Sequence, residues 1–391
     1  MSDSPLQRLV AEDDATRQKK GTSHTPAEIL QQPWLWRETA QRVIALTDRA
    51  RAILKDREFM VISGAGSSLH AGRLIEDAAN ARFGPSAQAV SCTDLLLKPE
   101  SFIPKGRRGV LLSLSRSGES PETVEAARRI GAEFPLVAQM AVTCNGASSL
   151  ARLMSARPDG LFVALHEKSY DRGLATTSSV TSTALAGRFL VDPADPKEFT
   201  DRVARLADSV EQGLGGASGE ALAALDPERV IFLGTGALEA AAQESAHKVL
   251  ELTDGQVPVM ARSPLEFRHG PIAFITPRTL VVFLIHPDPE IQIYERDLLR
   301  QLVSSKTALK VIALGSGNPE VLSTEADQVF PWIMPGERRA GEQGIWSLVF
   351  AQMLALFMSL RRGFIPDRPH TRGLVNPVVR GVTIHARKGG S

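Results

Sequence analysis

An apolar run ends in a glycine turn in the stretch Phe59-Met60-Val61-Ile62-Ser63-Gly64-Ala65-Gly66-Ser67-Ser68. The pattern returns as Val230-Ile231-Phe232-Leu233-Gly234-Thr235-Gly236-Ala237, so that Gly64 and Gly66 recur 170 positions later as Gly234 and Gly236. A short continuous apolar run that closes on a glycine turn indicates a buried strand. The recurrence indicates that the chain holds two copies of one fold.

Three further apolar runs recur in the same order. They are Val110–Leu114 with Leu280–Leu284, Ala138–Thr143 with Leu309–Leu314, and Asp159–Val163 with Asp327–Phe330. Between the runs, apolar residues fall at helical spacing over 71–81, 121–130, 237–252 and 291–302. Buried strands that alternate with helices are typical of a parallel sheet covered on both faces. We therefore expect an α/β chain built from two similar domains.

Composition narrows the possible functions. With 391 residues the chain is long enough for two domains, and its 45 basic and 44 acidic residues give a net charge of +1. A dedicated nucleic-acid surface would show a basic excess, so we expect no nucleic-acid partner. Cys92 and Cys144 have no metal-ligand spacing. The chain shows neither a signal-peptide pattern nor an apolar run of membrane-spanning length, so we expect a cytoplasmic protein without a membrane partner.

A loop rich in hydroxyls follows the second strand run as Ser115-Arg116-Ser117-Gly118-Glu119-Ser120-Pro121. Ser120 suits a helix N-cap and Pro121 the first helical position. Serine hydroxyls, unpaired backbone N–H groups and the positive end of a helix together form an anion site, which phosphate usually occupies. The alternative is a well-capped turn without a ligand. The second copy has His286-Pro287-Asp288-Pro289 at this place, so we expect only the first copy to keep such a site.

The second copy carries a charged cluster of its own. Glu244, Lys248 and Glu251 are spaced to share one face of a helix that opens at the Gly234 turn, near the strand ends. The alternative is a solvated charged stripe.

A histidine follows in a constrained segment. Ser263, Pro264 and Glu266 form a capping-box pattern, and Gly270-Pro271 ends the short helix it predicts, which holds His269 at a defined place. The alternative is a structural histidine. Thr25-Pro26-Ala27-Glu28 is a second capping-box pattern, near the N-terminus.

These motifs resemble those of sugar isomerase (SIS) domains. The Ser115–Ser120 loop resembles their Ser-x-Ser-Gly-Glu-Thr signature, and Ala65-Gly66-Ser67-Ser68 resembles their first-strand loop. Over about residues 50–385 the chain is similar to the isomerase half of glucosamine-6-phosphate synthase. It is more similar still to the galactosamine-6-phosphate deaminase/isomerase group, also called tagatose-6-phosphate ketose/aldose isomerases. The motifs shared with that group are Asp171-Arg172-Gly173 with its Thr/Ser run, Ser263–Pro271 and Val375–Val382.

The resemblance implies two tandem SIS domains, each a mostly parallel sheet flanked by helices in a flavodoxin-like three-layer sandwich. The expected divisions are an N-terminal segment 1–48, a phosphate-binding domain 49–195, a linker helix 196–222, a catalytic domain 223–362 and a tail 363–391.

The resemblance also implies roles for single residues. The sugar phosphate would be held by Ser67, Ser68, Ser115, Arg116, Ser117 and Ser120. Glu251 would move a proton between C1 and C2, and His269 would open the sugar ring, from the neighbouring subunit in the synthase. Glu244 and Lys248 match charged positions on the catalytic helix, and Thr176 falls in the sugar-contacting loop. Arg380 stands where the synthase has a lysine; because a guanidinium stays charged, Arg380 would orient the substrate.

The implied reaction converts D-galactosamine 6-phosphate to D-tagatose 6-phosphate and ammonia. No cysteine lies near the N-terminus to serve a glutaminase domain, so ammonia would be released and not supplied. The alternatives are another phosphosugar ketose/aldose isomerase or deglycase, and a non-catalytic SIS regulator that senses sugar phosphates. We expect no cofactor and no metal. The expected partners are a sugar phosphate and a second copy of the chain, in a homodimer or higher homo-oligomer with a shared active site.

Overall fold

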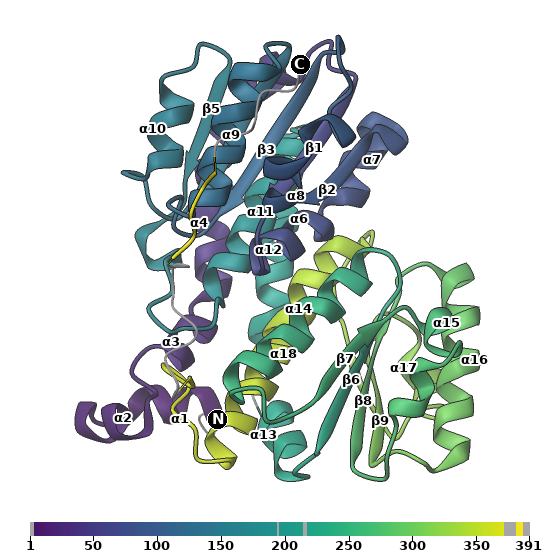
Figure 1. Cartoon of the computed structure of the whole chain (residues 1–391). Coiled ribbons are helices and arrows are strands. Elements are labelled where there is room, and N and C mark those ends of the chain that lie inside the picture. Colours follow the sequence, from purple (N-terminus) through teal and green to yellow (C-terminus); the bar gives the residue numbers. More distant parts are fainter. Residues whose placement is uncertain (1–3, 194, 214–216, 371–380, 386–391) are drawn as a thin grey trace. The chain divides into compact units, whose positions relative to one another are not determined.

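The computed structural model describes residues 4–193, 195–213, 217–370 and 381–385. These residues fold into two compact units that are not continuous in the sequence. Among the described residues, the first-sheet unit comprises 39–170, 182–193, 195–196 and 381–385, and the second-sheet unit comprises 4–38, 171–181, 197–213 and 217–370. Figure 1 shows the sheet of each unit and the helices that cover it.

The first-sheet unit contains a parallel five-stranded sheet in the order β2-β1-β3-β4-β5. The strands are β1 (Phe59–Gly64), β2 (Ala87–Ser91), β3 (Gly109–Ser115), β4 (Val137–Thr143) and β5 (Gly160–Ala164). Every residue of β1, β3 and β4 is buried, which explains their continuous apolar sequences. The strand order reverses direction between β1 and β3, and ligands of open α/β sheets bind outside the carboxyl ends of the strands at such a switch point.

Helices cover both faces of this sheet. One face packs its apolar side chains, Val61 and Leu111 among them, against α8 (Cys92–Leu97), α9 (Pro121–Glu133) and α10 (Ser149–Ser155). On the other face, a Cβ added to Gly72 of α6 (Ser67–Leu74) would lie 3.0 Å from Ile62, and one added to Gly187 of α11 (Ser178–Val191) would contact Leu114. Small residues thus let both helices approach this face closely.

The second-sheet unit repeats this topology. Its parallel sheet has the order β7-β6-β8-β9-β10, which matches β2-β1-β3-β4-β5 strand for strand. The strands are β6 (Arg229–Leu233), β7 (Val259–Arg262), β8 (Thr279–Ile285), β9 (Lys310–Gly315) and β10 (Gln328–Pro331). The turns after β1 and β6 also agree, since Gly66 has φ 53° and ψ −128° and Gly236 has φ 62° and ψ −125°. The predicted recurrence of strands is confirmed.

Two layers of helices cover the second sheet as well. One face packs against α15 (Pro264–Phe267), α16 (Pro289–Ser305) and α17 (Pro319–Leu322). On the other face, α14 (Ala237–Leu252) lies beside α18 (Ala340–Arg361), as Figure 1 shows. Among the described residues, α18 alone has the length and apolar composition of a membrane span, and 94% of its most apolar window is buried inside the structure. It is therefore a core helix of this unit.

The described residues form eight further helices. They are α1 (Pro5–Ala11), α2 (Asp14–Lys20), α3 (Thr25–Leu30), α4 (Gln32–Ile44), α5 (Thr47–Leu54), α7 (Glu76–Phe83), α12 (Pro196–Gly213) and α13 (Ala217–Ala224). Short 3₁₀ turns occur at η1 (Gly84–Ser86), η2 (Pro99–Ser101), η3 (Glu167–Ser169) and η4 (Pro271–Phe274).

Two local predictions were wrong. The single helix expected over 71–81 is broken at Ile75, whose backbone (φ −108°, ψ 1°) ends α6 and begins α7. The Thr25 capping box does not form either, because Thr25 lies inside α3 and donates its hydroxyl to Asp367 at 2.8 Å. The carboxylate of Glu28 accepts backbone N–H groups of Arg172 and Gly173 instead.

Candidate functional site

Two loops meet at the switch point of the first sheet. Ser67 and Ser68 begin α6 directly after the β1 turn, and the Ser115–Ser120 loop joins β3 to α9. Ser120 occupies the predicted N-cap position and Pro121 follows it, but the Ser120 side chain makes no capping hydrogen bond. Both helix N-termini thus begin without a side-chain cap, where an anion could accept their N–H groups.

The loop serines are oriented as hydroxyl donors. Ser115 Oγ accepts the N–H of Gly118 at 3.0 Å, and Ser117 Oγ accepts the N–H of Glu119 at 3.2 Å. A hydroxyl that accepts a backbone N–H retains its own O–H for donation. Both side chains are buried, so these donors are held in place before any ligand arrives.

The rest of the loop is tightly packed. Gly118 has φ +64°, and a Cβ there would lie 2.3 Å from Ser148 Oγ, so the position requires glycine. Glu119 accepts the N–H of Ser149 at 2.9 Å and its hydroxyl at 2.7 Å, which ties the loop to the start of α10. Glu119 therefore has a structural role in holding this loop.

Arg116 supplies the positive charge of this loop. Its carbonyl accepts the N–H of Cys144 at 3.0 Å and the hydroxyl of Thr143 at 3.1 Å. Its guanidinium lies over the ring of Tyr170, 5.5 Å from the centroid. The first-sheet unit thus gathers all six residues predicted to hold the phosphate on two neighbouring loops.

In the second-sheet unit, the charged cluster of α14 is buried. Lys248 and Glu244 are fully buried, and the Lys248 Nζ lies 3.2 Å from Glu244 Oε1 and 2.5 Å from Glu251 Oε2. The interpretation as a solvated stripe is thereby excluded. Of the two carboxylates, Glu251 retains partial exposure, at 17% of its side chain, so it is the one that a substrate can reach.

Electrostatics keep Lys248 charged. Burial lowers the pKa of Lys248, but the charges of Glu244 and Glu251 raise it by more, and the net pKa lies above the ordinary value. A protonated amine cannot attack a carbonyl, so Lys248 is suited to orient Glu251 and not to form a Schiff base.

His247 belongs to the same cluster, and the sequence analysis missed it. Its Nδ1 lies 3.7 Å from Glu244 Oε2 and its Nε2 lies 3.4 Å from Glu251 Oε1. Burial lowers the pKa of His247, whereas the hydrogen bond to Glu244 and the charge of Glu251 raise it to a net value above normal. The available signal was its spacing, since His247 lies three residues after Glu244 and four before Glu251.

Thr176 reaches this cluster from a distant part of the chain. Lys248 Nζ donates to Thr176 Oγ1 at 3.0 Å. The loop is fixed by Asp171, which is buried and accepts the N–H groups of Thr177, Ser178 and Ser179 at 2.9–3.0 Å. Asp171 thus caps the first turn of α11 and places Thr176 beside Lys248.

Glu28 supports the same loop from α3. Its Oε1 accepts the N–H of Arg172 at 2.6 Å, and a Cβ on Gly173 would lie 2.7 Å from Thr25 Oγ1. Burial and the nearby charge of Asp171 raise the pKa of Glu28 to about 8. The Asp171-Arg172-Gly173 motif therefore anchors this loop to α3 and to the start of α11.

His269 lies apart from the cluster within its unit. Ser263 caps α15 by accepting the N–H of Glu266 at 3.4 Å, and His269 follows α15 as an exposed residue before Gly270 (φ 116°). Arg380 lies outside the described residues. Thus Thr176 lies beside the charged residues of α14, and His269 is exposed to solvent.

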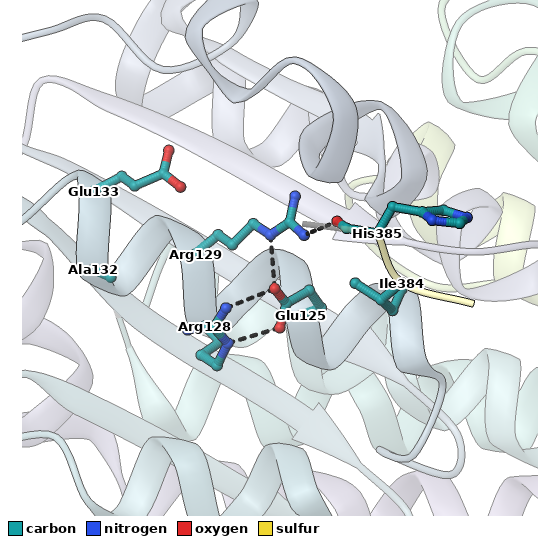
Figure 2. A pocket seen from close by; sticks show the side chains of 7 residues that line it. All are labelled: Glu125, Arg128, Arg129, Ala132, Glu133, Ile384 and His385. Atoms are coloured by element: carbon teal, nitrogen blue, oxygen red, sulfur yellow. Dashed lines mark hydrogen bonds and ion pairs between the residues drawn. The ribbon is translucent and has the colours of Figure 1, made fainter. Parts of the chain in front are cut away.

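The end of the described chain docks on α9. Figure 2 shows Ile384 and His385 beside this helix, where Arg129 donates to the His385 carbonyl at 2.8 Å. Ile384 also packs against the apolar core of the first-sheet unit. The adjoining cavity, about 430 Å³, is lined by Glu125 and Glu133 as well as by two arginines, so its charges balance and it is a poor anion site.

Comparison with known proteins supports a common ancestry for this chain and a set of phosphosugar enzymes. The SIS-domain family model matches residues 225–361. A Streptomyces coelicolor protein with the provisional name D-galactosamine-6-phosphate deaminase AgaS is 35% identical, over 93% of this chain and 95% of its own. The D-galactosamine-6-phosphate deaminase AgaS of Escherichia coli O157:H7 is 32% identical, over 92% of this chain and 95% of its own.

Solved structures of phosphosugar enzymes also share this fold. The crystal structure of tagatose-6-phosphate ketose/aldose isomerase from Escherichia coli superposes with a TM-score of 0.82 at 28% identity, over 97% of this chain and 99% of that one. The C-terminal domain of glucosamine-fructose-6-phosphate aminotransferase from Francisella tularensis has a TM-score of 0.72 at 18% identity, over 88% and 98% of the two chains, and shares the fold.

Proposed function

Because the chain belongs to the SIS-domain family that includes the D-galactosamine-6-phosphate deaminases AgaS, we propose that it converts D-galactosamine 6-phosphate and water to D-tagatose 6-phosphate and ammonia. The observation that carries the proposal is the ion pair between the buried Lys248 and the partly exposed Glu251, beside Thr176, on the helix that begins at the second glycine turn. The matching topology and glycine turn of the first sheet support a second SIS domain there.

In this proposal, the first-sheet unit anchors the substrate by its phosphate. Ser67, Ser68, Ser115, Ser117 and Ser120 donate hydroxyls or lie at helix N-termini, and Arg116 supplies the countercharge. Binding at a group that does not react holds the sugar in place for the chemistry.

Glu251 acts as the base in the open-chain sugar. It removes the proton at C2 and returns it to C1, while one proton of the amine passes to O1, so that the C1 aldehyde becomes an alcohol and the C2 amine becomes an imine. Water adds to the imine carbon, the C–N bond breaks, and ammonia leaves as the C2 ketone forms. Lys248 orients the Glu251 carboxylate through its 2.5 Å contact, and Arg380 would orient the substrate.

His269 serves ring opening from a neighbouring subunit in this proposal. Histidine exchanges protons near neutral pH, and His269 is exposed at the end of α15. Apolar side chains on α15 and the adjoining α16 are also exposed, namely Leu265 (48%), Ile293 (59%) and Tyr294 (59%). Such a surface suits contact with a second copy of the chain, and we therefore propose a homo-oligomer with a shared active site.

The test is ammonia release from purified protein supplied with D-galactosamine 6-phosphate. We expect Glu251→Gln to lower kcat by about 1,000-fold, within the range for a lost general base. Glu239→Gln, on the same helix but outside the cluster, should retain activity. If neither D-galactosamine 6-phosphate nor D-glucosamine 6-phosphate yields ammonia, the deaminase proposal fails.

A second candidate is simple ketose/aldose isomerisation of tagatose 6-phosphate, favoured by the similarity to the Escherichia coli isomerase structure. It needs the same proton transfer by Glu251 but releases no ammonia. Product analysis with both substrates separates the two reactions. A regulator that senses sugar phosphates would turn over neither. A cytoplasmic location stays a prediction.

A further inference from the structure

The switch point of the second sheet holds a buried acid. Glu295, on α16, is 1% exposed. Its Oε1 accepts the hydroxyl of Thr235 at 2.7 Å, and its Oε2 accepts the N–H of His286 at 2.8 Å. Thr235 lies in the turn after β6 and His286 directly follows β8. Glu295 thus bridges the ends of the two strands between which the order of the sheet reverses.

The equivalent strand ends of the first sheet carry the serine loops. There, five residues separate β3 from α9, whereas three separate β8 from α16. Counted from the helix N-caps, Ser120 and Asp288, the seventh residue is Ala127 in α9 and Glu295 in α16. A methyl group therefore stands in the first copy where the second has a carboxylate, and side chains on a helix lean toward its N-terminus, here toward the strand ends.

We propose that Glu295 is a built-in carboxylate ligand, which takes in the second sheet the place that a bound anion takes in the first and which positions the start of α14. Thr235, which donates the hydrogen bond to Glu295, directly precedes Gly236, the N-cap of α14. The carboxylate therefore fixes the point at which the helix of Lys248 and Glu251 begins. It follows that each chain binds one sugar phosphate and not two.

Neighbouring hydrogen bonds hold the segment that donates to Glu295. The His286 carbonyl accepts the Gln292 side chain at 2.7 Å, and His286 Nδ1 accepts the N–H of Asp288 at 3.0 Å. Gln343 donates to the carbonyl of Ile285 at 2.6 Å. The donors that face Glu295 are therefore held rigidly, as in a preformed ligand site.

The test uses acetate as the probe, because Glu295→Ala removes the equivalent of one acetate from the site. We expect Glu295→Ala to lower Tm by several degrees, and sodium acetate to recover part of that loss relative to sodium chloride at equal ionic strength. Leu299→Ala is the matched control, since Leu299 is fully buried one turn further along α16 and its removal leaves no polar donors. Wild type and Leu299→Ala should not respond to acetate. An equal response of both alanine variants would overturn the proposal.

A milder variant keeps the test decisive if Glu295→Ala does not fold. Thr235→Val removes one of the two donors at nearly constant volume and should lower Tm without any acetate response. A Thr235→Val protein with wild-type Tm would refute the bridge.

The proposed positioning of α14 rests on the proposed function. Enzyme activity measures this effect separately from Tm. In Glu295→Ala we expect kcat to fall at least tenfold with KM within twofold, because the phosphate loops are untouched, and acetate should restore part of kcat. If acetate restores Tm but no variant shows any turnover, the proposed reaction fails while the built-in ligand stands. Unchanged kcat in a folded Glu295→Ala enzyme would remove the positioning role.

Discussion

Replacement of Lys248 should lower both stability and activity most, because this residue neutralises two carboxylates inside the fold. In Lys248→Met, Glu244 would remain fully buried without its cation. We expect the free energy of unfolding to fall by about 3–5 kcal/mol, as when one partner of a buried pair is removed. Activity should fall by about 100-fold or more, since Glu251 loses its orienting contact. Urea denaturation and steady-state kinetics measure the two effects.

The double variant Lys248→Met/Glu244→Gln separates stability from catalysis. Replacing the buried carboxylate by an amide removes the charge that had faced Lys248, so stability should recover in part while activity stays low. Full recovery of activity in the double variant would contradict the orienting role of Lys248.

Gly118 shows how one backbone conformation supports the phosphate loop. Gly118→Ala places a methyl group at φ +64° and 2.3 Å from Ser148 Oγ, so the loop must shift. We expect KM for the sugar phosphate to rise about tenfold or more, equivalent to at least 1.4 kcal/mol of lost binding. Gly106→Ala is the control, because Gly106 also has positive φ (+75°) but no atom within 4 Å of an added Cβ. A similar KM for both variants would show that the clash is unimportant.

At the scale of elements, the long amphipathic patterns were the most predictable. The helix predicted over 237–252 is α14 to the residue, and the recurring strands are β1, β3, β4 and β5 with β6, β8, β9 and β10. The edge strands β2 and β7 were not predicted, because they are short and only partly buried. Helix α18 was not predicted either, because it is buried on every side and shows no apolar stripe.

The site was predictable where its chemistry is local in the sequence. The spacing of Glu244, Lys248 and Glu251 predicts one shared face, and the structure shows that they meet. Burial was not predictable from that spacing, since it depends on Thr176 and on the packing of α18. The roles of Asp171 and Glu28 depend on residues far away in the sequence, so a local pattern such as the Thr25 capping box misassigned Glu28.

Glu28, on α3, should make the stability of the fold depend on pH. Burial and the charge of Asp171 raise the pKa of Glu28 to about 8, so the folded state binds a proton that the unfolded state releases above pH 4.5. Stability is therefore fully present below pH 4.5 and is lost as pH rises toward 8, by on the order of 4 kcal/mol. Glu28→Gln mimics the protonated acid and should flatten this dependence. Urea denaturation at pH 5.5 and pH 8 checks it, and a variant as pH-sensitive as wild type would contradict the assignment.

At the scale of the whole molecule, shared active sites predict complementation. Glu251→Gln and His269→Ala should each be inactive alone. After mixing under conditions of subunit exchange, some sites would combine an intact Glu251 with an intact His269 from the other chain, and ammonia release should return to roughly a quarter of the wild-type rate if exchange is random. A mixture of Glu251→Gln with Lys248→Met, two defects on the same helix, should stay inactive. Activity of a protein that is monomeric in solution would refute the shared site.

The interleaving of the two units sets the order in which the newly made chain can fold. The helices up to Glu38 leave the ribosome first, yet they belong to a unit whose other described parts are 171–181, 197–213 and 217–370. The first sheet is made next, but its core is completed only when Ile384 emerges. At ordinary elongation rates this takes roughly 20–80 s, during which apolar surfaces of both units lack their final cover. Messages truncated near their 3′ end should therefore yield chains that aggregate or are degraded, even though both sheets have been translated in full.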